Sequence, residues 1–330
     1  MKTATANKSR NRQPHTTDKI PYLRDLAGFY EHVKARPPLH KEFDIRKIDP
    51  EVLKNYDFVA KPFRHSFFCM ALFLEGDISL NTGFWKVRLE RPAIYFKTPC
   101  QIVSWQKPEK WLKEYFVVFT ERFLADYKFL ADIIFDLPFF QLEKAVPLEL
   151  DPEEVSLLKG IYEQIMVEYQ SDRKDKFPLI ASYVHTLLLH VRRLYFKYVE
   201  TDEDLTSNIR QRDYHLVENF RSLIRNKIAE GEFDSRHLTV KHFASLLSTH
   251  PNHLNAVVKR QTENTAIAFM HEQILLESQS LLNQTEFAIK DIAGRLGFAD
   301  SSHFNHFFKK YTGDTPASYR KAKNPGHSLL

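Results

Sequence analysis

Apolar residues in the last third of the chain recur every three or four positions, which is the spacing of one face of an α-helix. The stripe from Ile289 to Leu296 predicts one short helix, and Phe304, Phe308 and Tyr311 lie on one face of the next. The same spacing predicts further helices over residues 215–229, 238–247, 251–261 and 266–283. We therefore expect the C-terminal part of the chain to be entirely helical.

Two pairs of these helices are joined by tight turns. Gly297 lies where one helix must stop, because glycine adopts a left-handed cap without steric cost. Asp300 or Ser301 can then accept backbone N–H bonds and start the next helix. Earlier in the chain, residues 248–250 supply the turn, and Pro251 takes the first helical position, which suits proline. Both pairs are expected to be helix–turn–helix units.

The first part of the chain has a different pattern. Short runs rich in aromatic and β-branched residues alternate with turn residues, and this close, regular spacing predicts a small β-sandwich or barrel. The expected strands cover residues 43–48, 67–74, 77–80, 84–89, 93–96, 102–105 and 115–119. In the run from Phe67 to Leu74 both alternating faces are apolar, so periodicity leaves open which face lies inward.

Helices are predicted on both sides of these strands, over residues 20–33 and 121–134. A longer helix starts after Asp151, which is followed by a proline and two acids, as expected at a capped helix N-terminus. Another covers residues 177–199, and both long helices carry continuous apolar stripes. The pair either packs on the strands or forms a dimer contact, and we favour the dimer contact.

Length and charge point to a basic end. At 330 residues the chain exceeds one typical domain, so two domains are expected. The net charge is +5, and residues 206–330 hold 16 Lys and Arg against 12 Asp and Glu. Residues 1–17 contain four basic residues and no acid, which predicts a basic, disordered tail. A cationic C-terminal region fits phosphate binding.

Hydropathy and cysteine usage narrow the location. No apolar run approaches the ~20 residues that span a bilayer, and the start of the chain lacks the apolar core of a signal peptide. We therefore expect a cytoplasmic protein without a membrane partner. Cys69 and Cys100 lie far apart in apolar surroundings, so burial is expected rather than a disulfide framework or a zinc site.

The polar face of the helix after Gly297 carries chemistry suited to DNA. Opposite its aromatic stripe lie small and amide side chains, which can contact base edges, followed by cations, which can contact phosphate. These side chains belong to Ser301, Ser302, Asn305, His306, Lys309 and Lys310. We interpret this helix as a DNA recognition helix.

The segment GFADSSHFNHFFKKYTGDTPASYR, residues 297–320, resembles the C-terminal signature of AraC/XylS-family transcription regulators. The matching positions are Gly297, Phe298, Phe304, Phe308, Lys309, Lys310, Gly313, Thr315, Pro316, Tyr319 and Arg320. The resemblance implies an α+β multidomain protein with an N-terminal cupin-like β-barrel with helices and a C-terminal all-α double helix–turn–helix DNA-binding domain. It implies a sequence-specific regulator that reads successive major grooves with two recognition helices, with double-stranded DNA and RNA polymerase as partners.

The resemblance also divides the chain. The expected parts are a basic tail (1–17), an effector and dimerisation domain ending in the helix pair (18–200), a linker (201–208), the DNA-binding domain (209–322) and a short tail (323–330).

Positions that contact DNA in the family map onto both helix–turn–helix units. The base-facing sites fall on Asn252, Asn255 and Ala256 in the first unit and on Ser301, Ser302, Asn305 and His306 in the second. Phosphate contacts are expected at Lys259, Arg260, Lys309 and Lys310. Three departures weaken the DNA reading of the first unit: Val258 replaces the usual Phe, Glu263 the usual Gly, and Ala256 a frequent polar residue.

The cupin-like region departs from metal-binding cupins. These supply an H-x-H pair and a later histidine, whereas His65 has Phe67 at the second position and Ser104 or a neighbour at the later one. A lone histidine cannot hold a metal that needs three or four protein ligands. We therefore expect no cofactor, no metal and no catalytic residue, and we interpret His65 as a strand-end or rim residue.

Two function classes follow from these patterns. The favoured class is a homodimeric DNA-binding regulator that is not an enzyme, with a small-molecule effector in the barrel, as small barrels often hold one. The alternative is a cupin enzyme, metal-independent or metal-dependent, with a DNA-binding tail. A set of metal ligands would favour the metal-dependent enzyme, and salt-sensitive DNA binding without turnover would favour the regulator.

Overall fold

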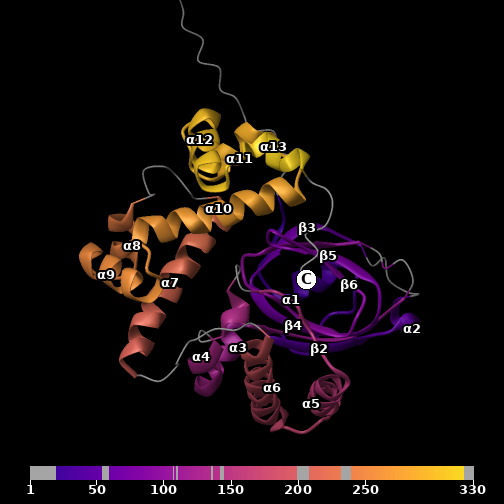
Figure 1. Cartoon of the computed structure of the whole chain (residues 1–330). Coiled ribbons are helices and arrows are strands. Elements are labelled where there is room, and N and C mark those ends of the chain that lie inside the picture. Colours follow the sequence, from indigo (N-terminus) through magenta and orange to yellow (C-terminus); the bar gives the residue numbers. More distant parts are fainter. Residues whose placement is uncertain are drawn as a thin grey trace, which may run out of the picture.

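We describe a computed structural model of the chain, which covers residues 20–53, 59–106, 108, 111–134, 137–141, 145–198, 208–231 and 239–322. A β-sandwich with flanking helices comes first, and a group of helices follows it (Figure 1). The expected mixed α+β architecture is therefore confirmed. The predicted tails 1–17 and 323–330 lie outside the described residues, as does the predicted linker 201–208 except for Asn208.

The strands form two five-stranded sheets. Sheet A has the order β1 (Tyr22–Leu23), β3 (Ala60–His65), β8 (Ile102–Trp105), β5 (Ile78–Thr82) and β6 (Trp85–Leu89). Sheet B has the order β10 (Leu148–Glu149), β7 (Ala93–Lys97), β4 (Phe67–Gly76), β9 (Leu112–Thr120) and β2 (Phe43–Ile48). Among the described residues no strand pairs across the two sheets, so the expected barrel is instead an open sandwich.

Strand β3, with six residues, is the longest of the strands that the pattern did not predict. It carries Lys61, Pro62 and Arg64, which weaken both its apolar alternation and its strand propensity. Its pairing with β8 shifts register between Ala60 and Phe63, and this irregularity accommodates Pro62, which cannot donate to a regular ladder. The two shortest strands, β1 and β10, were also not predicted.

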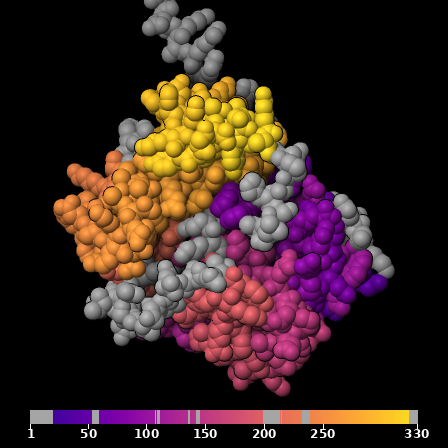
Figure 2. All heavy atoms as spheres, viewed as in Figure 1, coloured from indigo at the N-terminus to yellow at the C-terminus, as the bar shows by residue number. Residues whose placement is uncertain are grey.

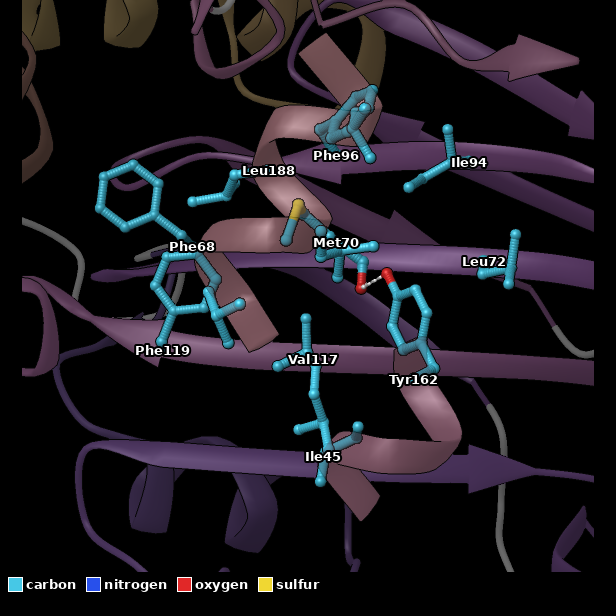
Figure 3. Close-up of a cluster of buried hydrophobic side chains, with 14 of the residues drawn as sticks. Ile45, Phe68, Met70, Leu72, Ile94, Phe96, Val117, Phe119, Tyr162 and Leu188 are labelled. Atoms are coloured by element: carbon cyan, nitrogen blue, oxygen red, sulfur yellow. Dashed lines mark hydrogen bonds between the residues drawn. The ribbon is translucent and has the colours of Figure 1, made fainter. Parts of the chain in front are cut away.

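Both faces of β4 are buried, because helices cover the outer side of sheet B. Phe67 and Cys69 face sheet A, whereas Met70 and Leu72 face α5 (Pro152–Gln170) and α6 (Lys176–Tyr198). Figure 3 shows Tyr162 of α5, whose hydroxyl donates a hydrogen bond to the Met70 carbonyl oxygen at 3.1 Å. This double covering explains why alternation along β4 could not identify its inner face.

The apolar stripes of α5 and α6 are used within the chain itself. Leu158, Ile165 and Leu187 are fully buried against sheet B. The surface that we expected to form a dimer contact is therefore covered, and the alternative, packing on the strands, is correct. Asp151 caps α5 as predicted, because its carboxylate accepts the N–H groups of Glu153 and Glu154.

The shorter helices of the first part differ from their predicted ranges. The helix expected over residues 20–33 is only α1 (Leu26–His32), which is preceded by β1. The helix expected over residues 121–134 is divided into α3 (Glu121–Asp126) and α4 (Lys128–Ile134), because Tyr127 has an extended backbone, with φ −130° and ψ 93°. The remaining short elements are α2 (Pro50–Leu53) and a 3₁₀ turn, Pro138–Phe140.

The C-terminal part consists of helices, as predicted. These are α7 (Asn208–Glu230), α8 (Val240–Leu246), α9 (Pro251–Thr262), α10 (Ala266–Gln284), α11 (Ile289–Arg295), α12 (Ser301–Thr312) and α13 (Pro316–Lys321). They share one apolar core, and α10 runs between the pair α8–α9 and the pair α11–α12 (Figure 1). Within the described ranges, no helix has the length and apolarity needed to cross a membrane.

Helix α10 also packs on sheet A. The Arg64 guanidinium of β3 forms a buried ion pair with the Glu277 carboxylate of α10. Near the end of α10, the Gln284 amide donates to the Gly83 and Ile102 carbonyl oxygens and accepts a hydrogen bond from the Ser104 hydroxyl. The C-terminal helices therefore lie directly against the sandwich, as the packed surface in Figure 2 shows.

Candidate nucleic-acid interface

Two helix–turn–helix units carry the candidate DNA-binding residues. The first unit is α8 and α9, and the second unit is α11 and α12. Both α9 and α12 have 12 residues, and they start 50 positions apart. In each, a threonine hydroxyl in the last turn donates to a carbonyl four residues earlier, at 2.8 Å, from Thr262 to Val258 and from Thr312 to Phe308. Helices α9 and α12 therefore match in length and in the hydrogen bond of their last turn.

The turns of the two units also match in hydrogen bonding. The Thr249 N–H donates to Ala244 O in the first turn, and the Phe298 N–H donates to Ala293 O in the second, both at 2.9 Å. Each turn requires one left-handed residue just before this donor, Ser248 with φ +51° and Gly297 with φ +76°. The first unit therefore holds a serine where glycine is free of steric cost.

A second left-handed position follows both α9 and α12. Glu263 ends α9 with φ +60°, and Gly313 ends α12 with φ +81°. The departure noted in the sequence thus changes the residue but keeps the backbone conformation. A non-glycine residue pays a steric cost in this region, so the first unit carries local strain twice.

Side chains cap the N-termini of both α9 and α12. The Asp300 carboxylate accepts the N–H groups of Ser302 and His303, which confirms one of the two predicted caps. These two bonds lower the pKa of Asp300, and the bond from the His303 N–H has the larger effect. In the first unit the His250 ring accepts the Asn252 N–H instead, at 3.3 Å.

The predicted contact residues of α12 lie together on an open face. Phe304 and Phe308 are buried in the helical core. Ser301 is partly exposed, and the other predicted side chains are exposed: Ser302, Asn305, His306, Lys309 and Lys310. Polar groups therefore occupy the N-terminal half of this face and cations its C-terminal half, which suits base and phosphate contacts respectively.

The predicted contact residues of α9 are less uniform. Asn252, Ala256 and Lys259 are exposed. Asn255 is only partly exposed, and its amide oxygen accepts the Ala266 N–H at 2.9 Å, which satisfies a free donor at the start of α10. The Arg260 guanidinium pairs with the Asp213 carboxylate of α7 at 2.8 Å. Two of the five predicted residues of α9 therefore already have partners within the chain.

The role of Asn255 was missed from the sequence, although a signal for it exists. Counting 50 positions forward, Asn255 corresponds to Asn305, and Ala266 corresponds to Pro316. Proline has no N–H, so the start of α13 needs no side-chain acceptor at that position. In the part of the chain that the structure describes, the Asn305 side chain makes no hydrogen bond, and it is exposed.

The linking helix holds both units firmly. Phe269, Ile274 and Leu282 of α10 are buried in the shared core. On the second unit, the Tyr311 hydroxyl of α12 lies 3.0 Å from the His271 ring nitrogen of α10. Both helix–turn–helix units thus pack against α10, which we call the rod below.

The sandwich contains a second candidate site, a cavity of about 340 Å³ between the sheets. His65 lies at the end of β3 as predicted, but it is fully buried and lines this cavity, so the rim position was wrong. Ser104 faces α10 instead, and its hydroxyl is hydrogen bonded to Asn81 and Gln284. Among the described residues no three His, Cys, Asp or Glu side chains are grouped as metal ligands.

The match to a protein family lies in the C-terminal helices. A family described as "Helix-turn-helix domain" matches residues 243–322. The chain is 33% identical over 96 residues to the uncharacterized HTH-type transcriptional regulator YtdP of Bacillus subtilis, which is 29% of this chain and 12% of that protein. It is 30% identical over 82 residues to the transcriptional activator RhaR of Cronobacter sakazakii, 25% of this chain and 29% of that protein.

A third relative, the bifunctional transcriptional activator/DNA repair enzyme AdaA of Bacillus subtilis, is 32% identical over 84 residues, 26% of this chain and 40% of that protein. The chain thus spans less than half the length of these relatives. Among solved structures, ToxT from Vibrio cholerae is 14% identical, with a TM-score of 0.36 over 87% of this chain and all of that one. The DNA-binding domain of AdpA, solved with a target DNA, is 19% identical, with a TM-score of 0.28 over 32% of this chain and 91% of that one.

Proposed function

We propose a function on one premise, that residues 243–322 form a helix–turn–helix domain of the AraC type. The chain is a sequence-specific, DNA-binding transcription regulator that inserts α9 and α12 into successive major grooves. The observation that carries this proposal is the pair of exposed polar faces on helices with one geometry, both held on α10.

The spacing of the two units supports contact with one face of the duplex. Helix α10 has 19 residues, which corresponds to ~28 Å at 1.5 Å per residue. With the width of the flanking helices added, the recognition helices are separated by about one DNA turn, ~34 Å. A rigid rod of this length lets both helices enter major grooves on the same side, with modest bending of the DNA.

Footprinting with the full chain tests this arrangement. Hydroxyl-radical cleavage should show two protected segments about one helical turn apart on one face of the duplex. The matched substitutions Lys309→Ala and Lys259→Ala should each weaken a different segment, Lys309→Ala the segment bound by α12 and Lys259→Ala the segment bound by α9. A footprint confined to half a turn would count against insertion of both helices.

Contacts between sheet A and α10 could carry the effect of a small molecule bound in the sandwich to the C-terminal helices. Residues on two neighbouring strands of sheet A alternate between the cavity and the linking helix: Phe63 and Val103 line the cavity, whereas Arg64 and Ser104 contact α10. A ligand that shifts β3 or β8 would thereby shift the rod on which both recognition helices sit. An effector in the cavity is therefore part of the proposed function.

Breaking the buried contact tests this coupling. Glu277→Gln removes the charge opposite Arg64 and leaves a buried cation without its ion pair. We expect looser attachment of α10 to sheet A, seen as faster amide exchange in β3 and α10, and a changed DNA affinity. Glu272→Gln, a substitution on the same helix at a partly exposed position, is the control. Equal exchange in both variants would contradict the coupling.

A homodimer is also part of the proposal, but through surfaces other than the buried stripes. Leu157 and Val167 are 46% and 63% exposed on α5. Val167→Glu should lower the dimer fraction in sedimentation, whereas the neighbouring Glu163→Gln should not. A monomeric wild-type chain would contradict the proposed homodimer.

Contact with RNA polymerase is proposed on the resemblance alone, and the proposed regulator acts without turnover.

A further inference from the structure

The cavity between the sheets has an apolar body. It is lined mainly by aromatic and aliphatic side chains from α1, both sheets and α5. Its volume of about 340 Å³ equals roughly eleven water molecules at ~30 Å³ each. Since such a space is large for ordered water and mostly lacks polar partners, it suits an organic molecule of roughly a dozen non-hydrogen atoms.

One buried ring nitrogen that lacks a hydrogen-bond partner among the described residues indicates a ligand. The Nδ1 atom of His65 lies 2.8 Å from the Phe67 carbonyl oxygen, which only accepts, so Nδ1 carries the proton. Burial lowers the pKa of His65 to about 3, so the ring is neutral and Nε2 holds a free electron pair. Among the described residues Nε2 has no partner, although His65 is only 1% exposed. A hydrogen-bond donor is missing there.

The cations around the cavity differ in how they are paired. Arg46 is paired with Asp44 at 2.6 Å, and Lys47 with Asp49 at 3.7 Å. Lys97, by contrast, has no carboxylate within 4 Å in the described part of the chain. Its ammonium lies 4.6 Å from the centre of the Trp105 ring and 5.5 Å from that of Tyr95. Within the described residues Lys97 thus contacts ring faces and lies in electrostatic range of Glu114, but it forms no ion pair, which leaves room for an anion.

Glu114, the one acidic residue among the described residues of the cavity wall, does not replace that anion. Glu114 is 3% exposed, and burial raises the pKa of its carboxyl group by more than the nearby Lys97 ammonium lowers it. The Tyr95 hydroxyl donates to it at 2.9 Å. A carboxyl group that is desolvated and already bonded is a weak counterion for Lys97.

We propose that the cavity binds a small organic carboxylate with an apolar body, whose acid group pairs with Lys97 and whose hydroxyl or N–H donates to His65 Nε2. This inference rests on the proposed function only in giving that ligand the role of effector. The aromatic wall holds the apolar body, and the paired rim cations leave Lys97 as the charge that selects for an anion.

Calorimetric titration of the full chain with isosteric probes tests the proposal. The probes are 2-naphthoate, its neutral amide 2-naphthamide and the amine 2-naphthylmethylamine, each of about a dozen heavy atoms. We expect 2-naphthoate to bind at least about tenfold more tightly than the amide, since a charge-assisted contact is roughly twice as strong as a neutral one. The amine should bind most weakly.

Variants separate the acid contact from the cavity itself. Lys97→Met keeps the length and apolar volume of the side chain, so it should lose the preference for 2-naphthoate roughly 10- to 100-fold while still binding the amide. Lys97→Arg should retain the preference. Lys86→Met, at an exposed lysine on β6, is the matched control and should bind like the wild type.

Several outcomes would overturn the proposal. These are equal binding of acid and amide, preference for the amine, or no binding of any probe to the folded wild-type chain at millimolar concentration. DNA affinity is measured separately on the same preparations. Failure of DNA binding with intact probe binding would reject the proposed regulator and leave the carboxylate site standing, and the reverse result would reject the site alone.

Discussion

The two helix–turn–helix units share one backbone but use the asparagine at the same position in opposite ways. Asn255 accepts the N–H of Ala266, whereas Asn305 is exposed, because the residue that corresponds to Ala266 is Pro316. One proline therefore frees a side chain that an alanine engages. The comparison teaches that a contact residue can be lost to the fold without any change at its own position.

At both left-handed positions the second unit has glycine, whereas the first unit has a residue with a side chain. Ser248 and Glu263 occupy positive φ in the first unit, and Gly297 and Gly313 do so in the second. The first unit thus combines backbone strain with an engaged asparagine. We propose that the second unit reads base sequence, and that the first mainly positions the rod through phosphate contacts.

The largest expected effect tests whether the units form one body. Phe308 of α12 is fully buried in the core that both units share. Phe308→Ala should lower the free energy of unfolding by about 3–5 kcal/mol, in one transition that includes both units. Urea unfolding followed by amide exchange in α9 and α12 measures this. His306→Ala, at an exposed position, is the control and should lie within about 0.5 kcal/mol of wild type. Separate transitions for α9 and α12 would break the comparison.

The next largest effects are expected from substitutions at the left-handed positions of the two units. Gly297→Ser should cost about 1–2 kcal/mol of unfolding free energy, because serine must adopt φ +76°. Ser248→Gly should stabilise by about 0.5–1 kcal/mol, since relief of the steric cost exceeds the added chain entropy of glycine. Glu263→Gly should act in the same sense. Thermal unfolding measures all three, and a destabilising Ser248→Gly would show that this turn is unstrained.

The asparagines should differ in sign. Alanine is the better helix former by up to about 0.7 kcal/mol, so Asn305→Ala should slightly stabilise the fold. Asn255→Ala gains the same propensity but loses a hydrogen bond worth about 1 kcal/mol and leaves the Ala266 N–H without its acceptor. We expect a difference of about 1 kcal/mol between the two variants in urea unfolding. Asn255→Asp keeps the acceptor and should behave like the wild type, and equal effects of both alanine substitutions would contradict the assignment.

The smallest expected difference concerns phosphate. Lys259 and Lys309 are both exposed at corresponding positions. Each substitution to alanine should weaken all DNA sequences similarly and reduce the salt slope of binding by about one unit. Titrations at several salt concentrations, on specific and random duplexes, test this equality. A loss confined to the specific duplex for either lysine would instead make it a base contact.

Much of this arrangement was predictable, for identifiable reasons. The helices of both units follow from apolar spacing and from start signals such as Pro251 and Asp300, because these signals are local. Strand β3 was missed because Pro62 and its charged neighbours hide a strand that is held by pairing with β8. The helix stripe around Leu187 was assigned to a dimer because periodicity shows that a face is buried but not what covers it.

The candidate site also contains residues that local sequence signals predict and residues that they do not. The exposed face of α12 follows from periodicity alone, and all of its predicted residues lie on it. Asn255 and Arg260 could not be placed in this way, since their partners, Ala266 and Asp213, lie on other helices. The cavity and the place of Lys97 in its wall also depend on the pairing of distant strands, which a single sequence does not reveal.

Selection of bound sites from a random duplex library, by the wild type, Asn305→Ala and Asn255→Ala, tests the central claim most directly. The account predicts that Asn305→Ala loses preference at one or two base positions, by about 1–3 kcal/mol each. Asn255→Ala should keep the wild-type preference at every position, with at most a uniform loss of affinity. An unchanged site for Asn305→Ala, or a lost base preference for Asn255→Ala, would contradict the division of roles between the two units.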